Sequence, residues 1–154
     1  MGLKLIYSIE THVHADHITG ASKLKEEFEC RSLVPQNAQV KCADRELKDG
    51  EIIYLDEEII IQSIATPGHT NSHNAYLINN KILLTGDSLF INGCGRTDFQ
   101  SGDSKTLYRS VVDKLFSLDD DVLVYPGHDY RGFTVSSIGY EKKFNTRFAN
   151  VTEA

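Results

Sequence analysis

The chain has 154 residues, of which 40% are hydrophobic and 25% are charged, and its formal net charge is −6. These values predict one soluble globular domain that is long enough to bury a core. The acidic balance argues against nucleic acid or an anionic membrane as the main partner. No apolar run has the roughly 20 residues of a membrane helix.

Cys30, Cys42 and Cys94 form no CxxC pair, which favours a reducing compartment over a disulfide framework. The N-terminal segment has neither the long apolar stretch nor the small-residue cleavage site of a secretory signal. We therefore expect a cytoplasmic protein, or a protein of the mitochondrial matrix if a transit peptide is missing from the sequence.

The first predicted elements are a strand and a helix. KLIYSI (4–9) is a short β-rich run. Thr19 is expected to cap a helix that continues through Phe28, because Ala21, Leu24 and Phe28 follow helical spacing.

A run of strands follows in the middle of the chain. EIIYL (51–55) and EIIIQSIA (58–65) predict two strands joined by an acidic turn. AYLI and KILLTGD flank Asn79 and Asn80. Because asparagine tolerates the positive φ of tight turns, this pattern predicts a β-hairpin.

The last third of the chain predicts helix, strand and helix. SGDSKTLYRSVVDKLFSL (101–118) begins with capping residues and places its apolar residues on one helical face. VLVYPGHD (122–129) is a short apolar strand, and the segment 133–148 is expected to end in a helix. The whole order indicates an α/β fold.

Four of the predicted strands run directly into a histidine or an aspartate, in YSIETHVHADH, QSIATPGHT, KILLTGD and LVYPGHD. Loops at strand ends are where α/β folds hold their sites. In the HVH stretch an extended backbone points His12 and His14 to one side. Imidazole and carboxylate ligands suit zinc, iron or manganese, and the lack of thiolates in the cluster disfavours a structural zinc site. The sequence therefore predicts one metal centre at a shared edge.

These motifs, THVHADH, TPGHT, TGDSLF and YPGHD in that order, resemble the metallo-β-lactamase superfamily over essentially the whole chain. The resemblance implies a single domain, 1–154, folded as an αββα sandwich with metal between the two sheets. Members usually have several strands ahead of the HxHxDH motif, whereas only eleven residues precede His12. We therefore expect a sandwich without the usual N-terminal strands, either as a truncated form or with a partner, such as a homo-oligomer, over the open edge.

Two branches of this superfamily compete. Persulfide dioxygenases oxidise glutathione persulfide with O₂ to sulfite and glutathione at one Fe(II), whereas glyoxalase II enzymes hydrolyse S-acyl-glutathione at a dinuclear site. GCGRTDFQ and the C-terminal segment HDYRGFTVSSIGYEKKFNTRF resemble the dioxygenases. The segment after His128 is also too short for the helical region of glyoxalase II. The resemblance favours a non-haem iron dioxygenase. A hydroxyacylglutathione hydrolase with Zn²⁺ or a mixed dinuclear site, or a catalytically silent metal-binding domain, remains the alternative.

The resemblance also implies roles for the clustered residues. His12, His69 and Asp87 match the iron ligands, as two histidines and one carboxylate with open positions. The positions that complete a dinuclear site in the hydrolases are His14, Asp16, His17 and His128. In the dioxygenases these residues would orient ligands and water by hydrogen bonds, and Asp16 is a catalytic candidate. Whether one metal or two binds stays open.

Four further residues are candidates for the substrate. Arg96 and Arg147 are expected to grip glutathione carboxylates through bidentate hydrogen bonds, with a surface salt bridge as the alternative for each. Tyr130 is a catalytic and substrate-binding candidate, with simple packing as its alternative. Cys94 is expected to line the pocket. His73 is expected to make a structural hydrogen bond rather than to bind metal.

Overall fold

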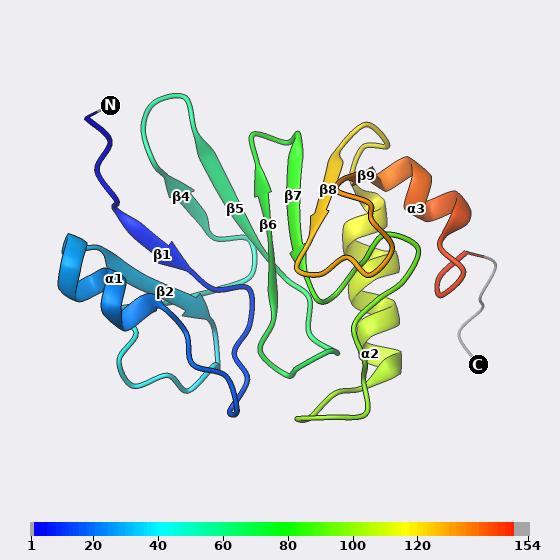
Figure 1. Ribbon diagram of the computed structural model, residues 1–154. Coiled ribbons are helices and arrows are strands. Elements are labelled where there is room, and N and C mark those ends of the chain that lie inside the picture. Colours follow the sequence, from blue (N-terminus) through cyan, green and yellow to red (C-terminus); the bar gives the residue numbers. More distant parts are fainter. Residues whose placement is uncertain (1, 150–154) are drawn as a thin grey trace.

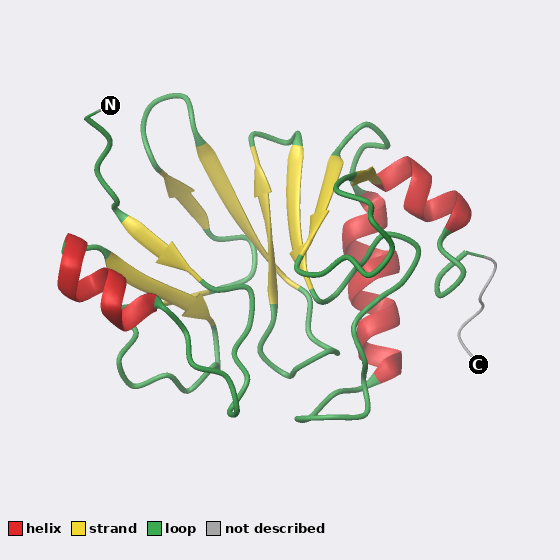
Figure 2. Ribbon diagram, viewed as in Figure 1, coloured by secondary structure: helices red, strands yellow, loops and turns green. Residues whose placement is uncertain are grey.

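The computed structural model describes residues 2–149, which fold into two sheets and three α-helices (Figures 1 and 2). The smaller sheet is parallel and has the order β1-β2-β3. Its strands are β1 (Tyr7–Ile9), β2 (Arg31–Pro35) and β3 (Arg45–Leu47). The larger sheet runs in sequence order from β4 to β9 and is antiparallel except where β7 pairs with β8. Its strands are β4 (Ile52–Tyr54), β5 (Ile60–Ala65), β6 (Asn74–Ile78), β7 (Ile82–Gly86), β8 (Leu123–Pro126) and β9 (Ser136–Ser137).

The α-helices cover the outer faces of the two sheets, as Figure 2 shows. They are α1 (Ala21–Phe28), α2 (Ser104–Arg109) and α3 (Ile138–Phe144). A π-helical turn, Ser110–Lys114, and a 3₁₀ turn, Leu115–Ser117, continue α2. Within the described residues, no helix combines the length and the apolar character needed to cross a membrane.

Two apolar clusters define the layers. The first lies between the sheets and contains Leu33, Leu47, Ile53, Ile61 and Tyr76. The second lies between the larger sheet and the helices and includes Leu77, Leu83, Val124, Leu107, Val111 and Ile138. In β2, side chains alternate: Leu33 joins the first cluster, while Ser32 and Val34 line a small cavity against α1. The order helix, sheet, sheet, helix confirms the expected αββα sandwich.

Most of the predicted elements are confirmed. Asn79 and Asn80 turn the β6–β7 hairpin with φ of 50° and 54°, and Asp103 caps α2 by accepting a hydrogen bond from the Thr106 N–H at 2.6 Å. The predicted cap of α1 was one residue early. Gly20 stands at the N-cap, and Thr19 Oγ1 accepts a hydrogen bond from the Ala21 N–H at 3.2 Å.

The strand ends meet as expected. The segment after β1 pairs with the start of β6, because the Asn74 N–H donates to the Thr11 carbonyl at 2.8 Å. β5, β7 and β8 run in the same direction, so their C-terminal ends lie at one edge of the larger sheet. This edge therefore receives ligand-type side chains from both sheets.

Candidate metal centre

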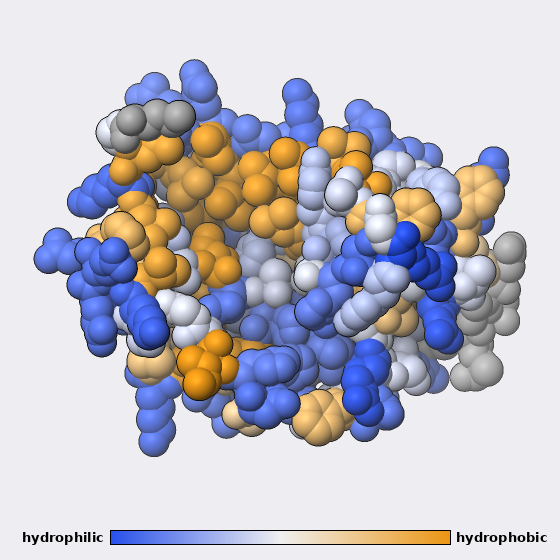
Figure 3. All heavy atoms as spheres, viewed as in Figure 1, coloured by the Kyte–Doolittle hydropathy of each residue, from blue (hydrophilic) through white to orange (hydrophobic). Residues whose placement is uncertain are grey.

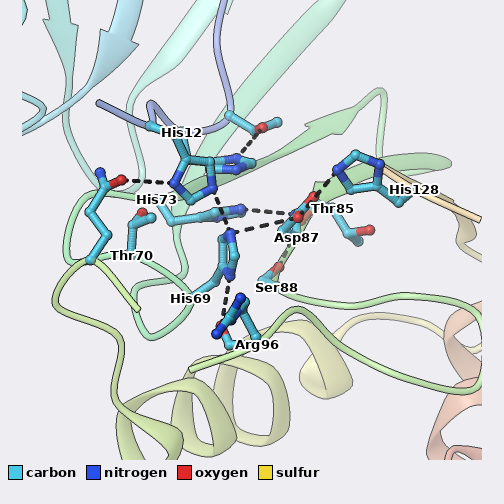
Figure 4. A network of polar contacts seen from close by, with 12 residues as sticks. His12, His69, Thr70, His73, Thr85, Asp87, Ser88, Arg96 and His128 are labelled. Atoms are coloured by element: carbon cyan, nitrogen blue, oxygen red, sulfur yellow. Dashed lines mark hydrogen bonds and ion pairs between the residues drawn. The ribbon is translucent and has the colours of Figure 1, made fainter. Parts of the chain in front are cut away.

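Three histidines from the two sheets form the centre of the site. The ligand atoms of His12, His14 and His69 all lie within 4.8 Å of one another. His14 Nε2 and His69 Nε2 are 3.0 Å apart. The His12 ring stands edge-on to both, with centroid distances of 4.8 and 5.0 Å. Figure 4 shows His12 and His69 directed at the same space, with Asp87 beside them.

In two of these rings, Nδ1 points away from the shared space and donates a hydrogen bond. His69 Nδ1–H donates to the Arg96 carbonyl at 2.7 Å, and His14 Nδ1–H donates to Gln100 Oε1 at 2.9 Å. In the neutral rings both Nε2 atoms then present lone pairs to each other. Two lone pairs at 3.0 Å repel unless a cation lies between them. The donor set therefore fits a metal ion.

Asp87, immediately after β7, adds a carboxylate. Its Oδ2 is 3.6 Å from His69 Nε2 and 3.5 Å from His128 Nε2. Its Oδ1 is buried, lies against Gly127, and has no hydrogen-bond partner among residues 2–149. Burial raises the pKa of Asp87, while the neighbouring histidines oppose that shift. A buried carboxylate oxygen without a donor is unfavourable, so this oxygen also fits a metal ion.

The electrostatics of the cluster keep His12 neutral. Burial, followed by the neighbouring His69 and His14, lowers the pKa of His12 from 6.5 to about 3. A neutral imidazole is the form that binds metal. His12 can therefore act as a ligand at neutral pH without first losing a proton.

Two glycines and one helix fix the His69 motif. Gly68 has φ of +133°, and a Cβ there would stand 2.3 Å from the Leu107 backbone nitrogen in α2. Ser110 Oγ donates to the Pro67 carbonyl at 2.7 Å from the π-helical turn. On the other side, a Cβ at Gly95 would stand 2.8 Å from His69 Nδ1. Only glycine permits these close approaches.

His73 has the structural role that the sequence predicts. Its Nε2 accepts a hydrogen bond from the Asp87 N–H at 3.1 Å, and its Nδ1–H donates to Thr66 Oγ1 at 2.9 Å. Its ring stacks on His12 with centroids 4.9 Å apart. His73 therefore supports two ligand candidates, as Figure 4 shows.

The remaining predicted metal residues lie at the mouth of the site. Asp16 and His17 are exposed, and the His17 ring lies 5.3 Å from the His14 ring. His128 is about half exposed and faces Asp87. All of them line one cavity of about 700 Å³ above the clustered histidines.

The substrate candidates divide between this cavity and a neighbouring one. Cys94, Arg96 and Tyr130 line the main cavity. Burial raises the pKa of the Cys94 thiol, and Tyr130 stacks on His128 at 5.8 Å. Arg147 lies instead in an adjoining cavity of about 220 Å³. Both cavities share the side chains of Phe90, Cys94, His128 and Tyr130.

Arg96 forms a surface salt bridge, which was the alternative to substrate binding for this residue. Its guanidinium pairs with Asp98 at 2.7 and 3.1 Å and lies over the Phe99 ring at 5.6 Å. It is the backbone carbonyl of Arg96, rather than its side chain, that contacts the histidine cluster.

Sequence reasoning missed two residues. Gln100 contacts His14, and Arg131 lines the adjoining cavity with Arg147. Neither residue type signals such a role by itself. The position of Gln100 within GCGRTDFQ was the only available hint.

Comparisons with known proteins agree with this geometry. The family model of the metallo-beta-lactamase superfamily matches residues 1–128. The chain is 44% identical over 149 residues to human mitochondrial persulfide dioxygenase ETHE1, covering 96% of this chain and 58% of that protein. It is 35% identical over 144 residues to a hydroxyacylglutathione hydrolase of Rhodopseudomonas palustris (strain ATCC BAA-98 / CGA009), covering 91% and 55%.

A solved structure shows the same arrangement of elements. The crystal structure of ETHE1 from Myxococcus xanthus superposes with a TM-score of 0.92 at 42% identity, covering 98% of this chain and 66% of that one. The chain thus spans 58% of the human relative's length. The fold, the order of the motifs and the family model agree, and the chain belongs to the metallo-β-lactamase superfamily.

Proposed function

We propose that this chain carries the metal site of a persulfide dioxygenase, which converts glutathione persulfide, O₂ and water into glutathione and sulfite. The outer sulfur loses four electrons and O₂ gains them, so the reaction balances without another oxidant. The observation that carries the proposal is the loop Cys94–Gln100, which lines the metal cavity and contacts two of the three clustered histidines. The higher identity to persulfide dioxygenase than to the hydrolase, 44% against 35%, supports it.

The metal that this proposal requires is one Fe²⁺ ion per chain. We assign its binding to His12, His69 and Asp87, a two-histidine, one-carboxylate set. Bound iron would supply the electron transfer that O₂ chemistry needs. His14 lies as close to the shared space as His69 does, so it is a fourth candidate. His128, Asp16 and His17 would hold water and substrate by hydrogen bonds from the cavity mouth.

The adjoining cavity suits the anionic part of glutathione. Arg131 and Arg147 both line it, and guanidinium groups bind carboxylates through paired hydrogen bonds. A substrate held there would extend its sulfur past Cys94 and Tyr130 toward the histidines, because both residues line both cavities. The Arg96 guanidinium would bind the substrate only after releasing its partner Asp98.

A hydrolase of S-acyl-glutathione is the second candidate. The observation that favours it is that His14, Asp16, His17 and His128 all line the metal cavity together with Asp87. These residues could complete a dinuclear site with Zn²⁺ or mixed metals. In that case these residues, together with Asp87, would hold the two ions, and the metals would activate water for hydrolysis.

The experiment that separates these functions combines metal analysis with two assays. Protein purified without oxygen is analysed for iron and zinc, then tested for O₂ uptake and sulfite release with glutathione persulfide. S-lactoylglutathione is tested in parallel. We expect one iron per chain and O₂ uptake that depends on the persulfide. Two metals, glutathione release from the thioester and no O₂ uptake would instead assign the hydrolase. Bound metal without either turnover would assign a silent metal-binding domain.

We also place this activity in a reducing compartment, the cytoplasm or the mitochondrial matrix. Cys30, Cys42 and Cys94 are all free thiols in the structure, as is usual in such compartments.

A further inference from the structure

The side chain of Gln100 forms three hydrogen bonds to the loop that carries His14, and we call this set of hydrogen bonds the clasp. Its Oε1 accepts hydrogen bonds from His14 Nδ1–H at 2.9 Å and from the Ala15 N–H at 3.3 Å. Its Nε2 donates to the Val13 carbonyl at 2.9 Å. One carboxamide therefore satisfies three consecutive residues of a loop that is more than eighty positions away in the sequence.

The partners of this carboxamide fix which way it points. Val13 offers only a carbonyl and Ala15 only an N–H, so the amide nitrogen must face the first and the oxygen the second. The oxygen then meets His14 Nδ1 as an acceptor, and His14 must carry its proton on Nδ1. Its Nε2 is left with a free lone pair, 3.0 Å from His69 Nε2.

The same loop fixes the second histidine of this pair. The Arg96 carbonyl accepts from His69 Nδ1–H at 2.7 Å. A single segment, Cys94–Gln100, therefore sets the protonated nitrogen of two histidines that come from different sheets. Hydrogen bonds from the ring nitrogen that does not face the metal commonly orient metal-binding histidines.

The His14 ring also contacts the rings of His12, His17 and His69, but only Gln100 determines which of its nitrogens carries the proton. Ala15, Asp16 and His17 are exposed, and His14 Nδ1 has no partner other than Gln100 among the described residues. Gln100 and Ser101 adopt φ of 44° and 61°, a backbone region that residues other than glycine seldom occupy. The rare backbone conformation coincides with the residue that makes the clasp.

We propose that Gln100 is a positioning residue that holds His14 in its Nδ1–H form and aims its Nε2 at the space shared with His69. The site thereby presents two nitrogen lone pairs to a metal ion before the ion arrives. Preorganisation of this kind strengthens binding, because less freedom is lost when the metal enters.

The test compares two variants of similar size. Gln100→Leu removes every hydrogen bond of the clasp, whereas Gln100→Glu keeps an acceptor for His14 and Ala15, loses the donor to Val13 and adds a negative charge. The dissociation constant for Zn²⁺ is measured by competition with a chromophoric chelator. We expect about a 10- to 100-fold weaker constant in Gln100→Leu and a change of only a few-fold in Gln100→Glu.

A second readout does not depend on metal or turnover. In long-range ¹H–¹⁵N spectra of the metal-free protein, His14 is expected as one Nδ1–H tautomer in the parent and in Gln100→Glu, and as a tautomer mixture in Gln100→Leu. His69 should keep its Nδ1–H tautomer in every variant, because its Nδ1–H donates to the Arg96 carbonyl. Ser101→Gly, which relieves the adjacent positive φ and leaves the clasp, is the matched control and should match the parent.

Two results would overturn the proposal. One is a Gln100→Leu variant that keeps the parent's Zn²⁺ affinity and His14 tautomer. The other is a Gln100→Glu variant that loses as much affinity as Gln100→Leu, since the acceptor would then be irrelevant. Thermal unfolding of each variant checks the fold. If Gln100→Leu does not fold, Gln100→Asn withdraws the same oxygen by one methylene and is expected to weaken Zn²⁺ binding in the same direction. These readouts need no dioxygenase activity, so they stay informative if the proposed function fails.

Discussion

At the scale of single residues, the ring of His73 joins two of the strand-end motifs. It is buried, accepts a hydrogen bond from the Asp87 N–H, donates to Thr66 Oγ1 and stacks on His12. Its two polar atoms are both satisfied inside the protein. Any apolar replacement would leave the Asp87 N–H without an acceptor in a dry environment.

His73→Phe is therefore expected to destabilise the metal-free protein by about 2–3 kcal/mol. Phenylalanine keeps a ring but leaves the buried Asp87 N–H and Thr66 hydroxyl without their His73 partner. Urea denaturation measures this change. Thr66→Val, which removes only the partner of Nδ1, should lose less. A His73→Phe variant as stable as the parent would show that the two hydrogen bonds contribute nothing.

The buried histidines also predict how stability depends on pH. Burial, and then the nearby His12, lowers the pKa of His73 well below 6.5, and burial lowers the pKa of His12 to about 3. Both folded-state pKa values lie below the unfolded value. The unfolded chain then binds protons that the folded chain excludes, so stability falls as the pH drops below 6.5.

We expect the metal-free protein to lose about 2–3 kcal/mol of unfolding free energy between about pH 7 and pH 5, with the share of the partly exposed His12 reduced by solvent screening. Urea denaturation at several pH values measures it. His73→Phe should show a clearly smaller slope. An equal slope in both proteins would mean that His73 is not the group that excludes the proton.

At the scale of elements, α3 holds the loop that follows β7. Glu141 is fully buried and accepts hydrogen bonds from the Asn92 N–H at 2.9 Å and Asn145 Nδ2 at 2.8 Å. Asn145 Nδ2 also donates to the carbonyls of Phe90 and Gly93, at 3.3 and 3.0 Å. This loop then leads through Cys94 to the Arg96 carbonyl on His69.

Asn145→Asp is expected to lower the unfolding free energy by about 3 kcal/mol or more, because it removes the donors and sets a second buried carboxylate beside Glu141. Denaturation at neutral pH measures the loss. Asn92→Gly, which keeps the backbone N–H and relieves a φ of 57°, is the control and should be at least as stable as the parent. Parent-like stability of Asn145→Asp would contradict the role of α3 as an anchor.

The sequence predicted the elements whose signals are local. Asn79-Asn80 identified the hairpin, the capping residues that begin the segment 101–118 indicated the start of α2, and the strand-end histidines indicated the candidate metal site. β2 and β3 were missed because RSLVP and REL mix charged residues with few apolar ones and lack the apolar runs of the predicted strands, and their burial depends on layers that only the folded chain brings together. Gln100 was missed for a related reason, since its partners lie in a distant loop.

At the scale of the whole molecule, the candidate metal site lies on the seam between the two sheets. His12 and His14 follow β1, whereas His69, Asp87 and His128 follow strands of the larger sheet. The Tyr76 hydroxyl donates to the Glu10 carbonyl at 2.7 Å across this seam. The apolar cluster between the sheets is therefore also what keeps the candidate ligands together.

The smaller sheet covers only part of the larger one. Leu84 lies opposite Tyr76 and Tyr125 in the strand register, so it shares the face that carries the apolar cluster between the sheets. Leu84, Leu123 and Tyr125 are nevertheless 38%, 41% and 38% exposed. Figure 3 shows a broad apolar area over this part of the molecule. Within residues 2–149, β1 beside it pairs with β2 on one side only.

An open strand edge next to an exposed apolar face favours association. We expect the chain to self-associate reversibly, with a sedimentation coefficient that rises with protein concentration. Leu84→Lys should weaken this association about tenfold or more, because burying a leucine contributes about 1.5–3 kcal/mol.

Ile52→Lys is the matched control. Ile52 is equally exposed, at 38%, but its neighbour Ile53 faces the other sheet, so Ile52 points away from the patch. A monomer at all concentrations, or equal effects of the two substitutions, would mean that this face does not drive contact between copies. The metal content of both variants should match the parent, because neither side chain lines the metal cavity.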